Sequence, residues 1–405
     1  MKLMEKKTIL LILSFLLFFS SHVYYAGASL EEKSVRSQPL EIQKKDKKLI
    51  EYGWDVPYVD FVEQNIREME EKPFNGIIFR LHDFDYAFDT RSWDEATLKL
   101  QLRSLARIQW GSFTDNFLFL FASNKFAMDW FNDVQWQIIM SNLKLMAKAA
   151  KVGQCKGVAL DPEGYSGKSP WKYPGEYKDK SFEEMEAQVR KRGAQFIGVF
   201  QQEFPDMVLL TFFQLSEIGI APNDAPGRQE ELKKNNYALL PAFLNGMLDA
   251  VAPNMHIVDG CENSYYNEDF KDYADDVELI KKRTLAWISP ENHEKYLSHV
   301  QAGMALYMDQ VLGLRESPQN YISYFLSPKE KLLWFEHNVY YALAYSDEYV
   351  WCYSENVNWW KNQVPEGAEA KIRSAQKKVE LGQPLRFEIA SRIKSGKKKL
   401  KAMNR

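Results

Sequence analysis

The feature that most constrains this chain is a strand followed by a helix, repeated eight times between about residue 50 and residue 360. Each predicted strand is a short apolar run, and the run at 76–81 is almost purely apolar, as expected for a parallel strand that is covered on both faces. The helices carry apolar residues three or four apart, for example Val62, Ile66 and Met69. Eight such units predict a single (β/α)8 barrel of the TIM type. A doubly wound open sheet is the alternative, weakened because no glycine-rich phosphate loop follows the first strand.

The strand positions follow from the apolar runs. They are predicted at 50–54, 76–81, 117–122, 157–160, 208–213, within 250–258, within 300–308 and at 349–353. Three helix starts are marked by Ser-x-x-Glu capping boxes, at 92–95, 181–184 and 327–330, the last with a proline at the first helical position.

The first 28 residues are predicted to be a signal peptide that is not part of the fold. Three lysines precede an apolar run at 9–19, and Ala26-Gly27-Ala28 fits the small-x-small cleavage pattern. The run has about 11 apolar residues, whereas a single-pass anchor, the competing interpretation, needs about 20. Cleavage after Ala28 predicts a secreted or periplasmic protein without stable membrane insertion.

The rest of the chain divides by composition. Residues 29–48 are charged and poor in large apolar residues, so we expect a linker there. The barrel is expected at 49–362, and a polar, basic extension at 363–405, either a solvated tail or a terminal helix.

Charge, cysteine content and aromatic content limit the class of protein to which this chain can belong. The formal charge is −3, and removal of residues 1–28 takes away three lysines and one glutamate and leaves −5, which argues against a nucleic-acid partner. Cys155, Cys261 and Cys352 match no metal spacing. We expect three buried small residues, with one disulfide and one free thiol as the alternative. Aromatic residues make up 14% of the chain, and rings at a barrel mouth suit stacking on sugars, although most could simply pack. The oligomeric state is not indicated.

The stretch GVALDPEGY at 157–165 is the strongest candidate for a site. It is an apolar strand that stops at Asp161 and Glu163, and residues two apart on a strand share one face. The carboxyl ends of barrel strands are where active sites are built, and two acids there can divide the work of general acid and general base. Asp161 precedes Pro162, so it could instead be a turn residue that bonds its own backbone.

Polar and aromatic residues also follow the other predicted strands. They are Trp54 and Asp55; Arg80, His82, Asp83 and Asp85; Ser123 and Asn124; Tyr165; Gln214 and Glu217; Asn254, His256, Asp259 and Glu262; Asp309 and Gln310; and Tyr353, Glu355, Asn356, Trp359 and Trp360. A cleft that cleaves polysaccharides needs this mixture, because acids transfer protons, polar groups bond hydroxyls and rings stack on sugars.

From these residues we choose two groups of candidates. The catalytic candidates are Glu163, Asp161, Glu262 and Glu355. The candidate substrate contacts are Trp54, Asp55, His82, Asp83, Asn124, Tyr165, Gln214, Tyr353 and Trp359. Structural roles compete: His82 can be a hydrogen-bonded packing residue, Asp55 and Asp83 can hold loops, and Glu355 can end a core strand.

Over about residues 50–360 the sequence resembles barrel glycoside hydrolases, with an opening Gly-Trp-Asp at 53–55 and a Trp-rich closing strand. The Asp-x-Glu at 161–163 is similar to the end of the chitinase-type signature. The resemblance implies that Glu163 is the proton donor and Asp161 its helper. Where that signature has further acids upstream, this chain has Gly157 and Ala159.

The leading hypothesis is therefore an exported glycoside hydrolase that acts on a poly- or oligosaccharide without a cofactor or metal. Glu163 is the expected acid, and Asp161, Glu262 or Glu355 its partner. One alternative is a metal-dependent sugar isomerase or aldolase, for which the hard ligands would be His82, Asp83, Asp161, Glu163, His256 and Glu262. The other is a carbohydrate-binding barrel without catalysis.

Overall fold

The computed structural model describes residues 46–403, except 124–125, 166–168, 223–224 and 387–388. The predicted signal peptide, its cleavage site and nearly all of the predicted linker lie outside the described residues, as does Asn124. No helix in the described ranges has the length and apolar character that crossing a bilayer requires.

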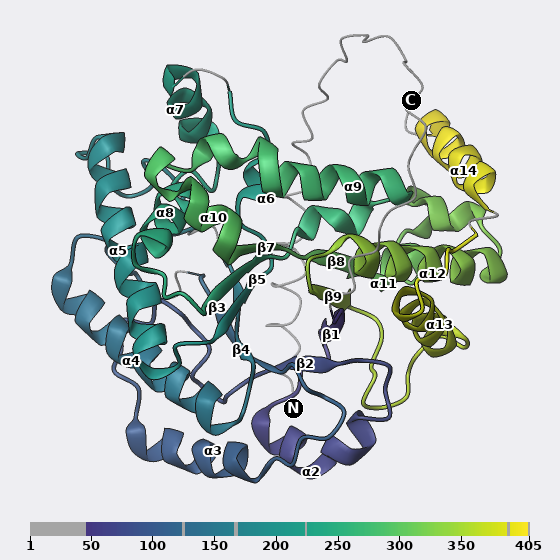
Figure 1. Ribbon diagram of the computed structural model, residues 1–405, viewed down its shortest axis with the longest axis horizontal. Helices are drawn as coiled ribbons and strands as arrows, with labels where there is room; N and C mark the ends of the chain where they lie inside the picture. Colours follow the sequence, from purple (N-terminus) through teal and green to yellow (C-terminus); the bar gives the residue numbers. More distant parts are fainter. Residues whose placement is uncertain (1–45, 124–125, 166–168, 223–224, 387–388, 404–405) are drawn as a thin grey trace, which may run out of the picture. The chain divides into compact units, whose positions relative to one another are not determined.

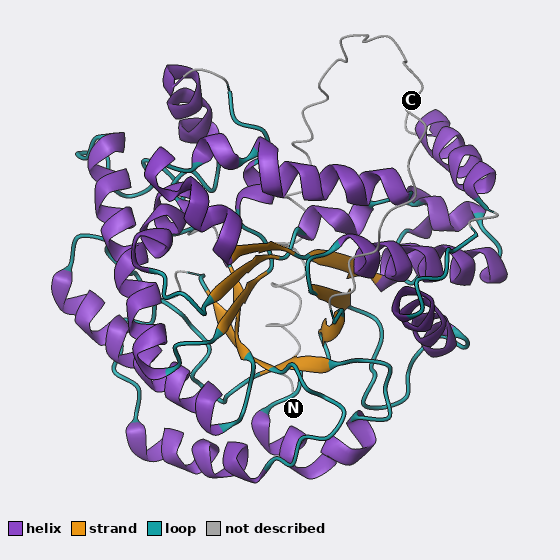
Figure 2. Ribbon diagram, viewed as in Figure 1, coloured by secondary structure: helices purple, strands orange, loops and turns teal. Residues whose placement is uncertain are grey.

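A ring of parallel strands forms the centre of the fold, and helices surround it (Figures 1 and 2). The strands run in the order β7-β6-β5-β4-β3-β2-β1-β9-β8. Their bounds are β1 Lys48–Gly53, β2 Gly76–Phe79, β3 Phe117–Phe121, β4 Gly157–Asp161, β5 Val208–Thr211, β6 His256–Asp259, β7 Val300–Ala302, β8 Met304–Tyr307 and β9 Tyr349–Ser354. The predicted TIM-type barrel is confirmed, and the open-sheet alternative is wrong.

The predicted seventh strand is split in two by Gly303. Its first half, β7, pairs with β6, and its second half, β8, pairs with β9, so the interrupted strand brings the two edges of the sheet together. The Gly303 amide donates to the Asp259 carbonyl at 2.8 Å. A Cβ at this position would lie 2.7 Å from a methyl of Val258, so a glycine is needed for the close approach.

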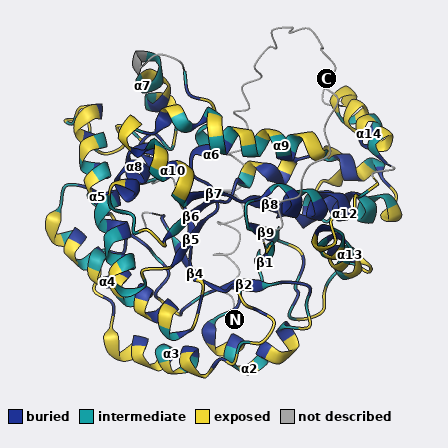
Figure 3. Cartoon of the chain, in the orientation of Figure 1, coloured by how far each residue is buried: buried dark blue, intermediate teal, exposed yellow. Residues whose placement is uncertain are grey.

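The helices present an apolar face to the barrel and a polar face to water, which Figure 3 shows as dark inner and yellow outer surfaces. Their bounds are α2 Val59–Met69, α3 Glu95–Arg107, α4 Asp133–Val152, α5 Phe182–Glu203, α6 Leu215–Ile218, α7 Ala225–Lys234, α8 Leu240–Ala250, α9 Phe270–Glu278, α10 His293–His299, α11 Met308–Leu312, α12 Pro328–Tyr345, α13 Ala368–Glu380 and α14 Ala390–Met403.

Two of the three predicted capping boxes are confirmed, those of α5 at Ser181 and of α12 at Ser327. The box at 92–95 is wrong. Asp94 caps α3 instead, and its carboxylate accepts from the amides of Ala96 and Thr97. The aspartate stands directly before the first helical residue, where its oxygens reach the free amides of the first turn.

Aromatic rings fill the barrel interior. Phe212 stacks on Trp351 with ring centres 4.2 Å apart, and Tyr52 lies 4.7 Å from Phe212 and 5.3 Å from Phe119. The interior is therefore a packed core, and any chemistry must take place above it. The three cysteines are buried and unbridged, as expected, and the disulfide alternative is wrong.

The C-terminal segment includes two helices rather than a tail alone. Glu336 of α12 accepts hydrogen bonds from Lys371, Ser374 and Lys378 of α13, which fixes that helix to the barrel.

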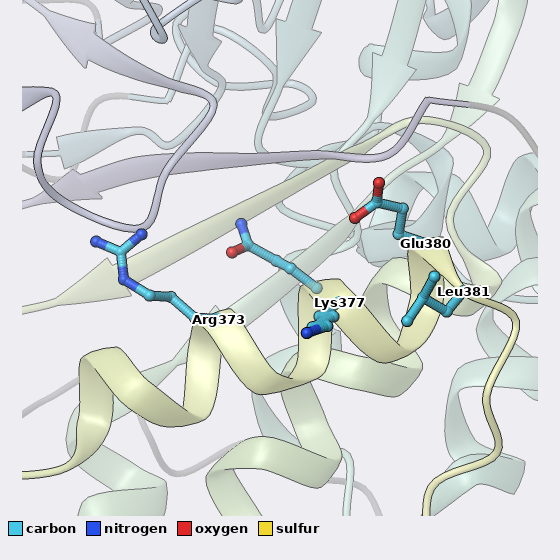
Figure 4. Close-up of a pocket in the computed structure, with 5 residues that line it drawn as sticks. Arg373, Lys377, Glu380 and Leu381 are labelled. Carbon is cyan, nitrogen blue, oxygen red and sulfur yellow. The ribbon is translucent and has the colours of Figure 1, made fainter.

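The outer side of α13 carries a pocket of about 440 Å³ (Figure 4). One of its lining residues, Gln376, bonds to the carbonyl of Pro73, shortly before β2 begins. The pocket thus lies by the amino ends of the strands.

Close packing of α5 against α8 depends on two glycines. A Cβ at Gly246 would lie 1.8 Å from the Arg190 carbonyl oxygen, and one at Gly193 would lie 2.1 Å from that of Phe243. We expect Gly246→Ala to lower the free energy of unfolding by about 3 kcal/mol, because the helices must move apart. Gly198→Ala in α5 is the control: its Cβ would meet nothing within 4 Å, so it should stabilise by up to about 1 kcal/mol. Equal unfolding midpoints in urea for the two variants would contradict this.

Candidate active site

Four acidic side chains meet at the carboxyl ends of three neighbouring strands. Asp161 ends β4 and Glu163 follows it, Glu217 lies in α6 directly after β5, and Glu262 begins a short helix at 262–266 after β6. The charges of Asp161, Glu163 and Glu217 all act on Glu262. The structure therefore brings the predicted pair together with Glu262, at the end of the barrel where active sites are built.

Asp161 is held from two sides. One of its oxygens accepts from the Glu163 amide at 2.9 Å, and the other accepts from the Tyr165 hydroxyl at 2.8 Å. The side chain is 1% exposed, and this burial, together with the charge of Glu163, raises the pKa of Asp161 to about 8. The turn interpretation holds, since Asp161 bonds the backbone two residues on. The same carboxyl also titrates near neutral pH.

The three glutamates have raised pKa values for the same main reason. Burial raises the pKa of Glu163, opposed by a hydrogen bond with Tyr165. Burial and the charge of Glu163 raise the pKa of Glu217 to about 7, and burial with the three neighbouring acids holds the pKa of Glu262 well above its usual range. Interacting carboxyls lose their protons in steps that belong to the group, so protonated and ionised acids coexist here. A site for acid and base catalysis needs that condition.

Asp259 fixes the two loops that carry Glu217 and Glu262. It is fully buried at the end of β6 and accepts from the amides of Gln214, Ser216 and Cys261, and from the Ser216 hydroxyl. The first two residues lead into α6, and the third immediately precedes Glu262. Asp259 is therefore a positioning residue for both glutamates.

We expect Asp259→Asn to lower kcat by about 100-fold, because an amide has one acceptor oxygen and cannot hold both loops in place. The change should also alter the pH profile, since the distance between Glu217 and Glu262 sets how strongly they interact. The measurement is kcat, KM and the pH profile on the best substrate. Asp309→Asn is the matched control, because Asp309 accepts from the amides of Glu355 and Asn356 in the same way. Loss of stability with an unchanged pH profile would make Asp259 merely structural.

Glu355 stands apart from this cluster. It follows β9 and accepts from the Tyr307 hydroxyl at 2.8 Å. Its charge acts on Tyr353, as do the charges of Glu262 and Glu163. Of the three candidate partners for Glu163, Asp161 and Glu262 have pKa values that the charge of Glu163 raises, whereas Glu355 is bound by Tyr307.

Exposed rings stand around the acids. Trp54 is 63% exposed, so its ring offers a flat apolar face to solvent. Tyr165 and Tyr266 are 37% and 42% exposed. These rings are placed as the sequence predicted for Trp54 and Tyr165, whereas Tyr266 was not predicted.

Two of the predicted substrate contacts, His82 and Asp83, interact with other parts of the protein. The ring of His82 stacks on Tyr58 with centres 4.1 Å apart, and its Nε2 lies 2.6 Å from Asp60 of α2. His82 is thus paired with the surrounding helix, as its packing interpretation requires. Asp83 is exposed in a left-handed conformation with φ 66°, and its charge acts on Arg91.

Asp55 and Trp359 form part of the packing. Asp55 accepts from the Trp359 amide at 2.7 Å, and the ring of Trp359 packs edge-on against Phe74 at 4.7 Å. This ring is 1% exposed, so in this structure it presents no free face on which a sugar could stack. Gln214 is buried, and its side-chain amide makes no hydrogen bond within the described ranges.

Glu217 and Arg80 are two of the charged residues that follow predicted strands but were not chosen as candidates. Arg80 is ion-paired with Asp85, and its guanidinium lies 5.3 Å from the ring centres of Tyr58 and Phe121. Its position at the end of β2 was the only signal in the sequence. Glu217 lies in the short helix α6, after β5 has ended, so the alternation of a strand gives no orientation for it.

The metal alternative is not supported by the donor geometry. In the part of the chain that the structure describes, no three His, Cys, Asp or Glu side chains could hold a metal ion together. His256 begins β6 and Glu262 follows its end, so these two proposed ligands lie at opposite ends of the strand.

No protein-family model matches the chain, and no curated protein matches it significantly. Solved structures with similarity include a GH5-4 broad specificity endoglucanase from an uncultured bacterium, with TM-score 0.44, 10% identity and coverage of 80% of this chain and 86% of that chain. An exo-beta-1,4-mannosidase from Opitutaceae bacterium strain TAV5 has TM-score 0.43 and 12% identity, covering 85% and 63%. A sugar phosphate isomerase/epimerase from Parabacteroides distasonis has TM-score 0.34 and 10% identity, covering 82% and 96%. Because these TM-scores are below 0.5, the functional argument rests on the side chains.

Proposed function

We propose that this protein is an exported glycoside hydrolase that cleaves O-glycosidic bonds of a poly- or oligosaccharide. The observation that carries the proposal is the cluster of Asp161, Glu163, Glu217 and Glu262 at the barrel mouth, with raised pKa values. Glycoside hydrolysis requires two carboxyl groups in different protonation states on either side of the scissile bond.

Glu163 is the general acid. Burial raises its pKa, which favours the protonated form that a general acid needs, and Asp161 fixes its backbone by accepting a hydrogen bond from the Glu163 amide. The proton passes to the leaving glycosidic oxygen. Because a sugar alcohol is a poor leaving group when unprotonated, this transfer is worth a large part of the rate.

Glu262 is the partner carboxyl group and acts in its ionised form, which the raised pKa of this buried group disfavours. Its carboxyl group has no hydrogen bond within the described ranges, so it is available to attack the anomeric carbon or to activate a water molecule. Attack gives retention of the anomeric configuration, and water activation gives inversion. Proton NMR of the first product formed distinguishes the two.

A hydrolysis screen of the mature protein, from Ser29 onward, against a glycan library tests the proposal. Release of new reducing ends by the wild type, unaffected by a strong chelator, is the expected result. Activity that a chelator abolishes and a divalent ion restores would favour the metal-dependent alternative. Binding of glycans by calorimetry without any turnover would favour the carbohydrate-binding barrel and end the hydrolase proposal.

Trp54 should bind substrate without taking part in the chemistry. We expect Trp54→Ala to raise KM about 10-fold and to leave kcat within about twofold, because the exposed ring can stack on a sugar face. Initial rates over a range of substrate concentrations separate the two effects. Leu100→Ala is the control, since this residue is also exposed but lies on α3. An unchanged KM for Trp54→Ala would exclude this surface as a sugar platform.

Export is tested separately. N-terminal sequencing of the protein from the medium or periplasm should find Ser29 as the first residue. A protein retained with residues 1–28 intact would contradict cleavage.

A further inference from the structure

Arg315 is a cation at the barrel mouth that is held by aromatic rings. It lies after β8 and α11, in the loop that precedes a short helix at 318–320. Its guanidinium carbon is 5.0 Å from the ring centre of Tyr307 and 5.3 Å from that of Tyr321. Contacts of this kind fix the plane of a guanidinium and leave its N–H groups to bond elsewhere.

No carboxylate pairs with Arg315 among the residues that the structure describes. Most other arginines of this fold have an acid partner within 4.0 Å: Arg67–Glu70, Arg80–Asp85, Arg91–Asp89, Arg107–Glu63, Arg190–Asp249, Arg192–Asp133 and Arg392–Glu330. The charge of Glu355 acts on Arg315, but Oε1 of Glu355 accepts a hydrogen bond from Tyr307.

The position of Arg315 places it beside the proposed catalytic acids. Tyr266, whose ring senses the charges of both Arg315 and Glu262, closes the one-turn helix that Glu262 begins. Tyr307 connects the two sides, since its ring lies 5.1 Å from Tyr265 of that same helix. Tyr266 therefore connects Arg315 with the proposed partner Glu262, because the charges of both residues act on its ring.

We propose that Arg315 binds an anionic substituent, a carboxylate or a sulfate ester, on a sugar unit next to the bond that is cleaved. The inference rests on the proposed function and names its substrate class. A guanidinium fork can donate two parallel hydrogen bonds to two oxygens of a carboxylate or a sulfate group. The carboxyl end of the barrel also carries the acids Asp161, Glu163, Glu217, Glu262 and Glu355, which repel an anion. A negatively charged sugar unit can therefore bind only next to Arg315.

Matched oligosaccharides test this subsite: one with a uronic acid unit, its neutral methyl ester, and a sulfated counterpart. For the wild type we expect kcat/KM to be about 10- to 100-fold higher on one of the anionic substrates than on the ester, as for a hydrogen bond to a charged group. Arg315→Gln should reduce that ratio to about one. Arg315→Lys should restore it in part, because lysine keeps the charge without the fork. Arg103→Gln, on the exposed side of α3, is the control and should keep the ratio.

The outcomes separate this inference from the hydrolase proposal. Hydrolysis of neutral and charged substrates at equal rates would overturn the anionic subsite and leave the hydrolase intact. If Arg315→Gln lowers kcat/KM by the same factor on all three substrates, the anionic subsite is also overturned, because the residue would then only support the fold. If nothing is hydrolysed, calorimetric binding still decides: preference for an anion that is lost in Arg315→Gln supports the subsite, and equal binding of ester and anion rejects it.

Discussion

Replacing Glu163 by glutamine is expected to lower kcat by about 1,000-fold while KM changes by no more than a few-fold. Glutamine keeps the shape of the side chain, but its amide has no acidic proton to give to the leaving oxygen. The measurement is the initial rate on the best substrate of the screen. The basic limb of the pH profile should change as well, because that limb reports the loss of the general acid's proton, and burial raises the pKa of Glu163.

The role of Glu163 is separated from that of Glu262 by the leaving group. An aryl glycoside with an acidic phenol leaves without protonation, so Glu163→Gln should recover most of the bond-cleavage rate on it, whereas Glu262→Gln should not. Glu186→Gln in α5 is the control: burial also raises its pKa, to about 7, but its charged neighbours are Glu183 and Lys233. Equal turnover by wild type and Glu163→Gln on ordinary glycosides would remove Glu163 from catalysis.

The fold was largely predictable because its signals are local. Each strand is a short apolar run, each helix has a periodic apolar face, and the capping boxes at Ser181 and Ser327 lie within four residues. The split of the seventh strand was not predictable, because Gly303 breaks it only where β6 and β9 approach from opposite sides. The Asp94 cap was missed because Ser92 competes with it only two residues earlier.

The site was predictable where a strand defines the direction of its side chains. Asp161 ends β4 and Glu163 follows two residues later, so alternation along the strand, continued for two residues, predicted that both acids would meet at the same strand end. Glu217 could not be placed, because its loop is shaped by hydrogen bonds to Asp259 on the neighbouring strand. Burial of Trp359 against Phe74 likewise depends on residues almost 300 positions apart.

Replacing Glu262 by glutamine is also expected to change the free energy of unfolding. We expect Glu262→Gln to be inactive yet more stable than the wild type by about 1 to 2 kcal/mol at pH 8, a gain typical of removing strain from an active site. Burial and the charges of Glu163, Asp161 and Glu217 raise the pKa of Glu262, so the folded protein binds this proton more tightly than the unfolded chain. The wild type therefore loses stability as the pH rises above the ordinary glutamate pKa of about 4.3. Glutamine does not titrate and avoids that loss.

Urea unfolding of both proteins at pH 4 and pH 8 measures the difference. The gain should be present at pH 8 and nearly absent at pH 4, where Glu262 is protonated in the folded and largely in the unfolded state. Glu294→Gln removes the same charge from the exposed side of α10 and should show no such pH dependence. A loss of stability at both pH values would mean that Glu262 stabilises the fold. The expected pattern would show instead that the fold tolerates a buried acid whose benefit lies in chemistry, since nothing in the packing requires it.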